Sequence, residues 1–144
     1  MDLALLRLLR TRGHWPPLER AVRLYAAAGE NGALWLALGV LARDRRTIRV
    51  VLITLAANTA MKQVVRRSRP SLPDLPPLAS TISGRSYPSA HAATSFAAAG
   101  ALGGSAPIYA AAAAMALTRP YLGVHYPSDV VAGALLGRAV ERLL

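Results

Sequence analysis

Residues 92–118 read AATSFAAAGALGGSAPIYAAAAAMALT, and this stretch decides the fold that the sequence predicts. Its only ionisable side chain is Tyr109, and most of its other residues are small and apolar. The run Gly-Gly-Ser-Ala-Pro at 103–107 combines residues that interrupt helices. We therefore expect two apolar helices, at about 89–104 and 106–118, that fold back on each other as a hairpin.

Three further apolar segments flank this hairpin, at about 24–42, 47–65 and 128–142. Glu30 and Asn31 interrupt the first of them. No segment is an uninterrupted span of about 20 apolar residues, so flanking residues would have to complete a crossing of the bilayer core. The chain shows neither the alternation typical of strands nor an internal repeat. It predicts an all-α integral membrane bundle of about five apolar helices.

The N-terminus, MDLALLRLLRTRGHW (1–15), places apolar residues and arginines at helical spacing. This pattern predicts an amphipathic helix lying on a membrane surface, and the alternative is a surface helix of a soluble bundle. The segment lacks the basic-then-apolar order of a signal peptide. We expect one domain over 1–144, formed by an amphipathic segment at 1–23 and a helical core at 24–142.

The composition narrows the classes of function. Of the 144 residues, 53% are hydrophobic, none is Cys, and the net charge is +10. Without Cys the chain has no disulfide, thiolate zinc site or thiol nucleophile. A net positive charge could indicate a nucleic-acid partner. However, the arginines cluster between apolar segments and form no continuous basic stripe, so we expect no nucleic-acid partner and a lipid bilayer instead.

The basic residues also predict a topology. If the five apolar segments alternate in direction, the Arg-Asp-Arg-Arg turn at 43–46 and the C-terminal Arg138 and Arg142 lie on one side. Loops rich in arginine and lysine tend to be cytoplasmic. The opposite face would carry the Pro- and Ser-rich loop at 70–87. We expect a multi-pass plasma-membrane protein whose functional face is extracytoplasmic.

Three short motifs would meet on that face. They read KQVVRRSRP at 62–70, YPSAH at 87–91 and TRPYLGVHYPSD at 118–129. In the second motif, Ser89 can cap a helix, and the free amides of Ala90 and His91 at that helix end suit an oxyanion. The first and third motifs supply the remaining candidates, which are Lys62, Arg69, Arg119, His125 and Asp129.

Three cations, two imidazoles and one carboxylate on one face predict a site for a phosphate dianion. Arginine forks and a lysine ammonium bind phosphate oxygens. One histidine can attack phosphorus while the other protonates the leaving oxygen. Asp129 would fix the tautomer of the attacking ring. A polar loop with His and Asp adjacent by chance would explain the third motif alone, but not all three together.

These motifs resemble the signature of the type 2 phosphatidic acid phosphatase superfamily: Lys-x6-Arg-Pro, Pro-Ser-Gly-His and Ser-Arg-x5-His-x3-Asp. Their order and internal spacings are kept, while Ala90 and Thr118 stand where Gly and Ser are usual. The resemblance implies a phosphatase that needs neither metal nor cofactor. Within the superfamily, the whole chain looks most like small actinobacterial enzymes that dephosphorylate polyprenyl-linked phosphoribose.

The resemblance also implies a role for each residue. His125 would be the nucleophile that forms a phosphohistidine, Asp129 its orienting partner, and His91 the acid for the leaving alcohol and then the base for water. The phosphoryl oxygens would be bound by Lys62, Arg69, Ser89 and Arg119, with the amides of Ala90 and His91. The implied substrate is a phosphate monoester or pyrophosphate of a membrane lipid, either polyprenyl-linked or a glycerophospholipid.

A function of another class stays open at this point. A non-catalytic membrane protein could bind anionic lipid headgroups through the same basic face. His91, His125 and Asp129 argue against it, because headgroup binding requires cations and no nucleophile. The oligomeric state is also open, with a homo-oligomer as one alternative.

Overall fold

The computed structural model describes all residues, 1–144, and contains helices, loops and one isolated β-bridge between Ser68 and Arg85. Seven α-helices follow in chain order: α1 (Asp2–Thr11), α2 (Pro16–Ala28), α3 (Ala33–Leu41), α4 (Arg45–Val65), α5 (Ala90–Ala101), α6 (Ala106–Tyr121) and α7 (Pro127–Leu143). A short 3-10 turn, η1 (Glu30–Gly32), joins α2 to α3. The predicted all-α class is confirmed.

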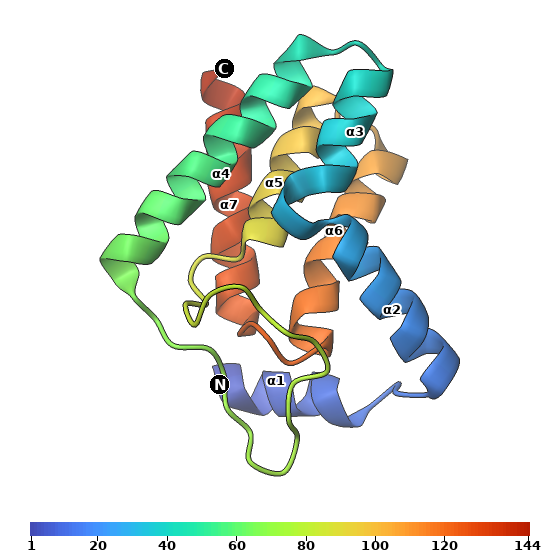
Figure 1. Ribbon diagram of the computed structural model, residues 1–144, viewed down its shortest axis with the longest axis vertical. Helices are drawn as coiled ribbons and strands as arrows, with labels where there is room; N and C mark the ends of the chain where they lie inside the picture. The colour runs from blue at the N-terminus through green and yellow to red at the C-terminus, as the bar shows by residue number, and fades with distance from the viewer.

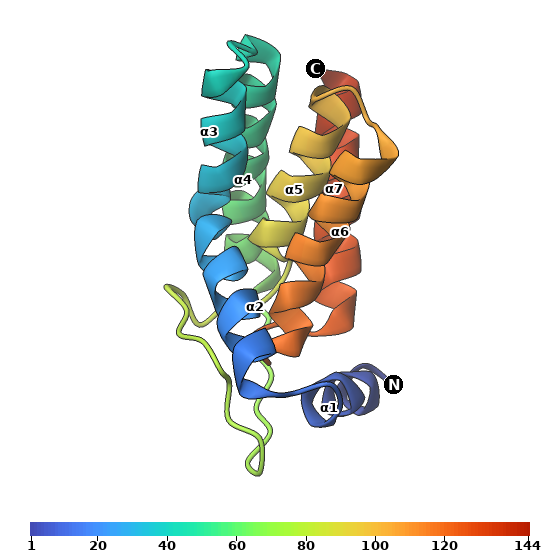
Figure 2. The same cartoon turned by 90° about the vertical axis from the view of Figure 1, so that its right-hand side faces the viewer.

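Helix α5 lies at the centre of the bundle, in contact with α4, α6 and α7, whereas α1 crosses beneath one end (Figures 1 and 2). The expected hairpin is present as α5 and α6. Its turn contains Gly103 and Gly104, which have φ angles of 92° and 64°. Glycine adopts such positive φ values without steric cost, so the breaker seen in the sequence makes the turn.

Two glycines let α7 lie directly against α5. A Cβ atom at Gly137 would stand 2.1 Å from the carbonyl oxygen of Ala93, and one at Gly133 would stand 2.4 Å from that of Ser89. Any side chain at either position would therefore push the helices apart. At the end of this contact, the amide of Ser89 donates a hydrogen bond to the carbonyl oxygen of Asp129 (3.0 Å). The close approach fixes the first turns of α5 and α7 beside each other.

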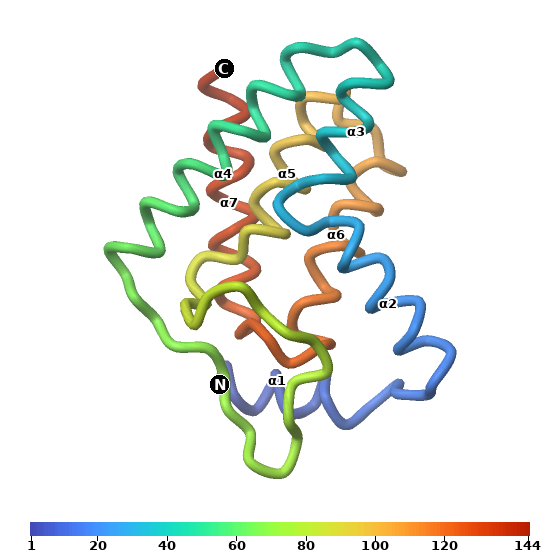
Figure 3. The backbone as a smooth tube through the Cα atoms, in the orientation of Figure 1, coloured from blue at the N-terminus to red at the C-terminus, as the bar shows by residue number.

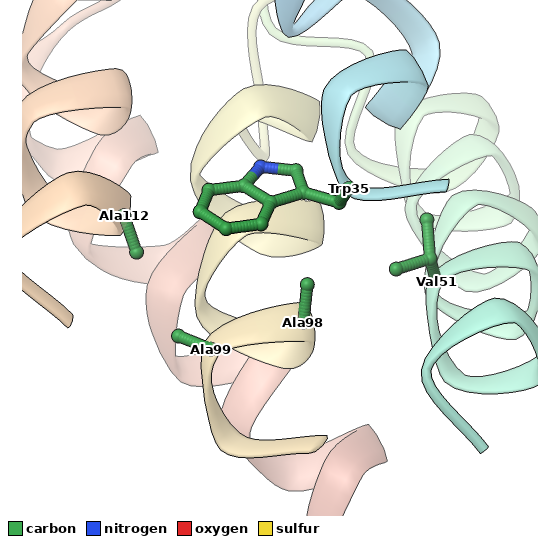
Figure 4. Close-up of a cluster of buried hydrophobic side chains, with 5 residues drawn as sticks. All are labelled: Trp35, Val51, Ala98, Ala99 and Ala112. Atoms are coloured by element: carbon green, nitrogen blue, oxygen red, sulfur yellow. The ribbon is translucent and has the colours of Figure 1, made fainter. Parts of the chain in front are cut away.

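An apolar cluster fills the half of the bundle away from α1 (Figure 4). It consists of Trp35, Val51, Ala98, Ala99 and Ala112. The indole of Trp35 is 2% exposed and occupies the space that the small alanines of α5 and α6 leave. Its Nε1–H donates to the hydroxyl of Ser95 (2.8 Å), so its polar atom is satisfied where it is buried.

The first predicted apolar segment, 24–42, is not one helix. It is divided between α2 and α3, and the two parts, Pro16–Ala28 and Glu30–Leu41, are bent by 50°. Helix α2 begins at Pro16, so the expected boundary between 1–23 and 24–142 falls inside a helix. The interruption at Glu30 and Asn31 is therefore a break between two helices.

One helix, α4, is long and apolar enough by itself to cross a membrane, and the bent pair of α2 and α3 passes the same test when taken together. The 21 residues of α4 span about 32 Å at 1.5 Å per residue. Large apolar side chains also face outward from α4 and α7, among them Leu52, Val131 and Leu135. The number of about five membrane-crossing helices stays a prediction.

The two ends of the bundle differ in content. The α3–α4 turn and the C-terminus lie at one end, where Arg46 forms an ion pair with Glu141 (2.9 Å). The loop at 66–89 and α1 lie at the other end (Figure 3). The Arg-Asp-Arg-Arg turn and the three motifs therefore lie toward opposite ends of the bundle, as alternation of the segments predicts.

Helix α1 packs on the bundle and contacts the loop at 66–89, which is called the long loop below. Its Leu6 and Arg10 are buried, whereas Leu3 and Leu8 are about half exposed. Arg10 donates to the carbonyl oxygen of Pro76 (2.7 Å), and Arg7 pairs with Asp74. That α1 also lies on a membrane surface stays a prediction.

Candidate active site

A cavity of about 330 Å³ opens beside the N-terminus of α5. Most of the residues that the motifs single out line it: Lys62, Arg69, Ala90, His91, Arg119 and His125. They come from α4, the long loop, α5, α6 and the loop before α7. Ser89 and Asp129 are fully buried and do not line the cavity. The structure therefore places six of the eight candidates around one space and two behind it.

Arg119 is the least satisfied of the cations. It is 5% exposed, its Nε atom has no hydrogen-bond partner, and its guanidinium forms no ion pair. A buried charge without a partner is costly. Since Arg119 lines the cavity, an anion bound there would supply the missing partner.

Lys62 and Arg69 connect the bundle to the long loop. The ammonium of Lys62 donates to the carbonyl oxygen of Arg85 (3.2 Å). Arg69 donates to the carbonyl oxygens of Ser83 and Val124, at 2.7 Å each. These bonds use only part of the three donors of a lysine and the five of an arginine. Both side chains are oriented by the loop and keep donors for an anion.

His125 lies between a carboxylate and a guanidinium. Its Nδ1 is 3.5 Å from Oδ2 of Asp129, and its Nε2 is 3.1 Å from Nη1 of Arg69. Burial lowers the pKa of His125 to about 4, and nearby cations add to this although Asp129 opposes it. The ring is therefore neutral at pH 7. With its proton on Nδ1, facing Asp129, the lone pair of Nε2 is directed away from the carboxylate.

Asp129 is held by two donors. Its Oδ2 accepts from the amide of Tyr126 (2.9 Å), and its Oδ1 accepts from Nη1 of Arg67 (2.9 Å). The other arm of Arg67 donates to Asp2 of α1 (2.8 Å), and its guanidinium stacks 3.9 Å from the ring centre of Tyr126. A chain of contacts thus runs from α1 through Arg67 and Asp129 to His125.

Arg67 was missed by the sequence reasoning. It lies two residues before Arg69 in the extended segment that follows α4. Side chains at i and i+2 of an extended chain point to the same side. That periodicity could have paired Arg67 with Arg69, because both reach the segment at 124–129.

His91 occupies the first turn of α5, which begins as predicted. The hydroxyl of Ser89 caps the helix by accepting from the amide of Ala92 (3.4 Å). The Nε2 of His91 lies 3.0 Å from the carbonyl oxygen of Ala26 on α2. Thr118, in contrast, uses its hydroxyl within its own helix, donating to the carbonyl oxygen of Met115 (2.7 Å), and it does not line the cavity.

Known proteins resemble this chain in sequence. A family model described as the PAP2 superfamily matches residues 46–144. The decaprenylphosphoryl-5-phosphoribose phosphatase of Mycolicibacterium smegmatis is 42% identical in an alignment of length 130, and the alignment covers 82% of this chain and 72% of the relative. The protein of that name from Mycobacterium tuberculosis is 38% identical in an alignment of length 141, and the alignment covers 90% of this chain and 80% of the relative.

Two solved structures share the fold. LpxE of Aquifex aeolicus superposes with a TM-score of 0.78 at 25% identity, covering 99% of this chain and 93% of that one. A PAP2 type phosphatidylglycerolphosphate phosphatase of Bacillus subtilis superposes with a TM-score of 0.71 at 22% identity, covering 99% and 81%.

The fold and the family match together define a phosphatase of the membrane lipid-phosphatase class. More particularly, the chain belongs to the PAP2 superfamily. The resemblance inferred from the three motifs is confirmed, and so is the predicted enzyme class. The similarity to polyprenyl-phosphoribose phosphatases is confirmed as well.

We expect Arg67→Ala to lower kcat by roughly 10–100-fold while changing KM much less, because a misplaced reacting group costs rate more than binding. Removing Arg67 leaves Oδ1 of the buried Asp129 without its donor, which frees the carboxylate to move relative to His125. Steady-state kinetics on a lipid phosphate in detergent would measure both constants. Arg7→Ala, which removes an exposed ion pair with Asp74 on the same loop, is the matched control.

A merely structural role would be visible as a lowered unfolding temperature with kcat unchanged in the folded fraction. That outcome would contradict the positioning of Asp129 by Arg67. Arg67→Lys, which keeps the positive charge and can donate to Asp129, should restore part of kcat.

Proposed function

We propose that this protein removes the terminal phosphate from a polyprenyl-linked sugar phosphate, with His125 as the nucleophile. The observation that carries the proposal is Arg119, a buried guanidinium without a protein partner that lines the same cavity as His125. A phosphate monoester supplies the charge that this guanidinium lacks. The names of the relatives that are 42% and 38% identical support the polyprenyl-linked sugar as the rest of the substrate.

In the proposed complex, Arg119, Arg69 and Lys62 bind the phosphoryl oxygens. The phosphate would displace the contact between Nη1 of Arg69 and Nε2 of His125, which are 3.1 Å apart. The amides of Ala90 and His91 at the N-terminus of α5 add partial positive charge. Ser89 serves this site from behind, by capping α5. The bound phosphorus then faces the lone pair of His125 Nε2.

In the first chemical step, a bond forms between Nε2 of His125 and phosphorus, and the bond from phosphorus to the sugar oxygen breaks. His91, which donates from Nε2 to the carbonyl oxygen of Ala26, would carry a second proton on Nδ1 and give that proton to the leaving oxygen. Asp129, 3.5 Å from Nδ1, stabilises the positive charge that develops on the ring of His125. In the second step, His91 takes a proton from water, and the water oxygen displaces His125 from phosphorus. Inorganic phosphate leaves, and the free enzyme returns.

A non-catalytic headgroup-binding protein fits the structure less well. It would need the cations, but it would gain nothing from a buried Asp129 held by two donors beside a neutral His125. Burying a carboxylate is costly, and it is kept here in contact with one particular ring. This arrangement favours a catalytic role.

We expect purified wild-type protein in detergent to release phosphate from a short-chain polyprenyl phosphoribosyl phosphate, and His125→Ala to reduce this release to background. The substitution removes the only proposed attacking atom. His14→Ala is the matched control, since His14 stacks on Tyr121 outside the cavity and should leave turnover near that of the wild type. Turnover by His125→Ala near that of the wild type would remove His125 as nucleophile. No turnover of any lipid phosphate by the wild type would favour headgroup binding.

His91→Ala should slow substrates with poor leaving groups far more than substrates with good ones. A sugar alkoxide needs a proton as the bond breaks, and a positioned acid contributes about 10²–10⁴-fold to such a step. A nitrophenolate leaves without this help. The comparison uses the pre-steady-state burst, because His91 also serves as base in the second step. Equal losses for the lipid phosphate and nitrophenyl phosphate in the burst would show that His91 is not the acid.

We also propose that the cavity opens on the extracytoplasmic side of the plasma membrane. The Arg-Asp-Arg-Arg turn lies at the opposite end of the bundle, and arginine-rich turns tend to be cytoplasmic. The chain has no Cys, so single cysteines can report the sidedness. In intact cells, Ser71→Cys in the long loop should react with an impermeant thiol reagent, whereas Arg45→Cys should react only after lysis. The reverse pattern would invert the topology.

A further inference from the structure

The break between α2 and α3 places Glu30 on the wall of the cavity. Gly29 lies close to two neighbouring side chains, because a Cβ atom there would lie 2.4 Å from the sulfur of Met115, which would have to shift, and 3.1 Å from the ring of His91. Asn31 and Gly32 then take left-handed conformations, with φ angles of 50° and 72°. The result is that Oε2 of Glu30 lies 3.8 Å from Nε2 of His91.

Glu30 is the only carboxylate that lines the cavity, among cations that would hold a phosphate. Its side chain is 46% exposed and forms no hydrogen bond within the protein, and neither does the side-chain amide of Asn31. A free carboxylate beside a phosphate dianion is repulsive. The negative charge of Glu30 acts on Arg69 and Arg119 at longer range, but its oxygens form no hydrogen bond with either and are free to accept from a second, neutral ligand group that donates hydrogen bonds.

A role through His91 explains Glu30 less well. The Nε2 atom of His91 already has a closer partner in the carbonyl oxygen of Ala26, at 3.0 Å against 3.8 Å for Glu30. That carbonyl fixes the ring without help from a carboxylate. Glu30 and Asn31 also lie next to each other on the cavity wall, and neither uses its acceptor oxygens within the protein. A residue that only held the ring of His91 would not need such a neighbour.

We infer that Glu30 and Asn31 form a half-site for the hydroxyl groups of a sugar, next to the half-site for phosphate. The carboxylate of Glu30 accepts from one or two hydroxyls, and such charge-assisted bonds are short and strong. Asn31 adds a neutral acceptor and donor. A cavity of about 330 Å³ is at the small end of ligand sites, so it suits a sugar phosphate headgroup with the lipid chain outside. This inference rests on the proposed function and identifies the residues that recognise the sugar.

Two substrates that differ only in sugar hydroxyls test the half-site. One is a short-chain polyprenyl phosphoribosyl phosphate, and the other is its 2,3-dideoxyribosyl analogue, which has the same chain and the same terminal phosphate. We expect wild-type protein to favour the ribosyl substrate in kcat/KM. Glu30→Gln should lower this preference roughly 10–100-fold, the range for losing a hydrogen bond to a charged group. Glu19→Gln is the matched control, because Glu19 pairs with His14 and Arg23 on α2 away from the cavity.

The outcomes separate this inference from the proposed function. If the wild type hydrolyses both substrates equally well, or if Glu30→Gln slows both equally, the half-site is wrong while the proposed function holds. If the wild type hydrolyses neither, the proposed function fails and the half-site with it. If Glu30→Gln does not fold, Asn31→Gly provides the second variant, because glycine keeps the left-handed backbone and removes the amide. It should lower the preference in the same direction.

Discussion

The close contact of α5 with α7 is the constraint on which the rest of this structure depends. At Gly133 and Gly137 the backbone of α7 lies against backbone oxygens of α5, with no space for even a methyl group. Overpacking such a contact typically costs about 1–3 kcal/mol. Because the helices lie this close together, the amide of Ser89 reaches the carbonyl oxygen of Asp129. Two motifs that are about forty residues apart in the chain thereby share one cavity wall.

How much could be predicted depended on whether a feature follows from local sequence. Helix capping by Ser89 and the Gly103–Gly104 turn are local, and both were anticipated. Six of the cavity residues followed from the alternation of the segments and from the family signature. The packing of α1 on the long loop could not be predicted in this way, because it depends on a hydrogen bond from Arg10 to the backbone oxygen of Pro76. Nothing in the spacing of an amphipathic helix indicates such a partner.

Arg67 and Glu30 show why part of the site was not predicted. Each had been seen in the sequence, Arg67 as one more arginine in a basic loop and Glu30 as an interruption of an apolar segment. The role proposed for each depends on its tertiary position: Arg67 contacts the buried Asp129, and Glu30 lines the cavity. Charged residues mark the places where a bundle departs from simple packing, but the sequence does not say which partner compensates each charge.

The charged residues around the cavity differ in whether the protein itself supplies their partner. Asp129 is compensated within the protein by Arg67, so it does not neutralise the cavity cations directly. Arg119 forms no ion pair or hydrogen bond through its guanidinium within the protein. If Asp129 paired with a cavity arginine instead, its carboxylate would occupy the proposed phosphate site, and His125 would lose the proposed orienting group. Arg67, which also pairs with Asp2 of α1, occupies Oδ1 of Asp129 instead. The N-terminal helix is thus linked through Asp2 and Arg67 to the carboxylate behind the cavity, although it lines no part of the cavity.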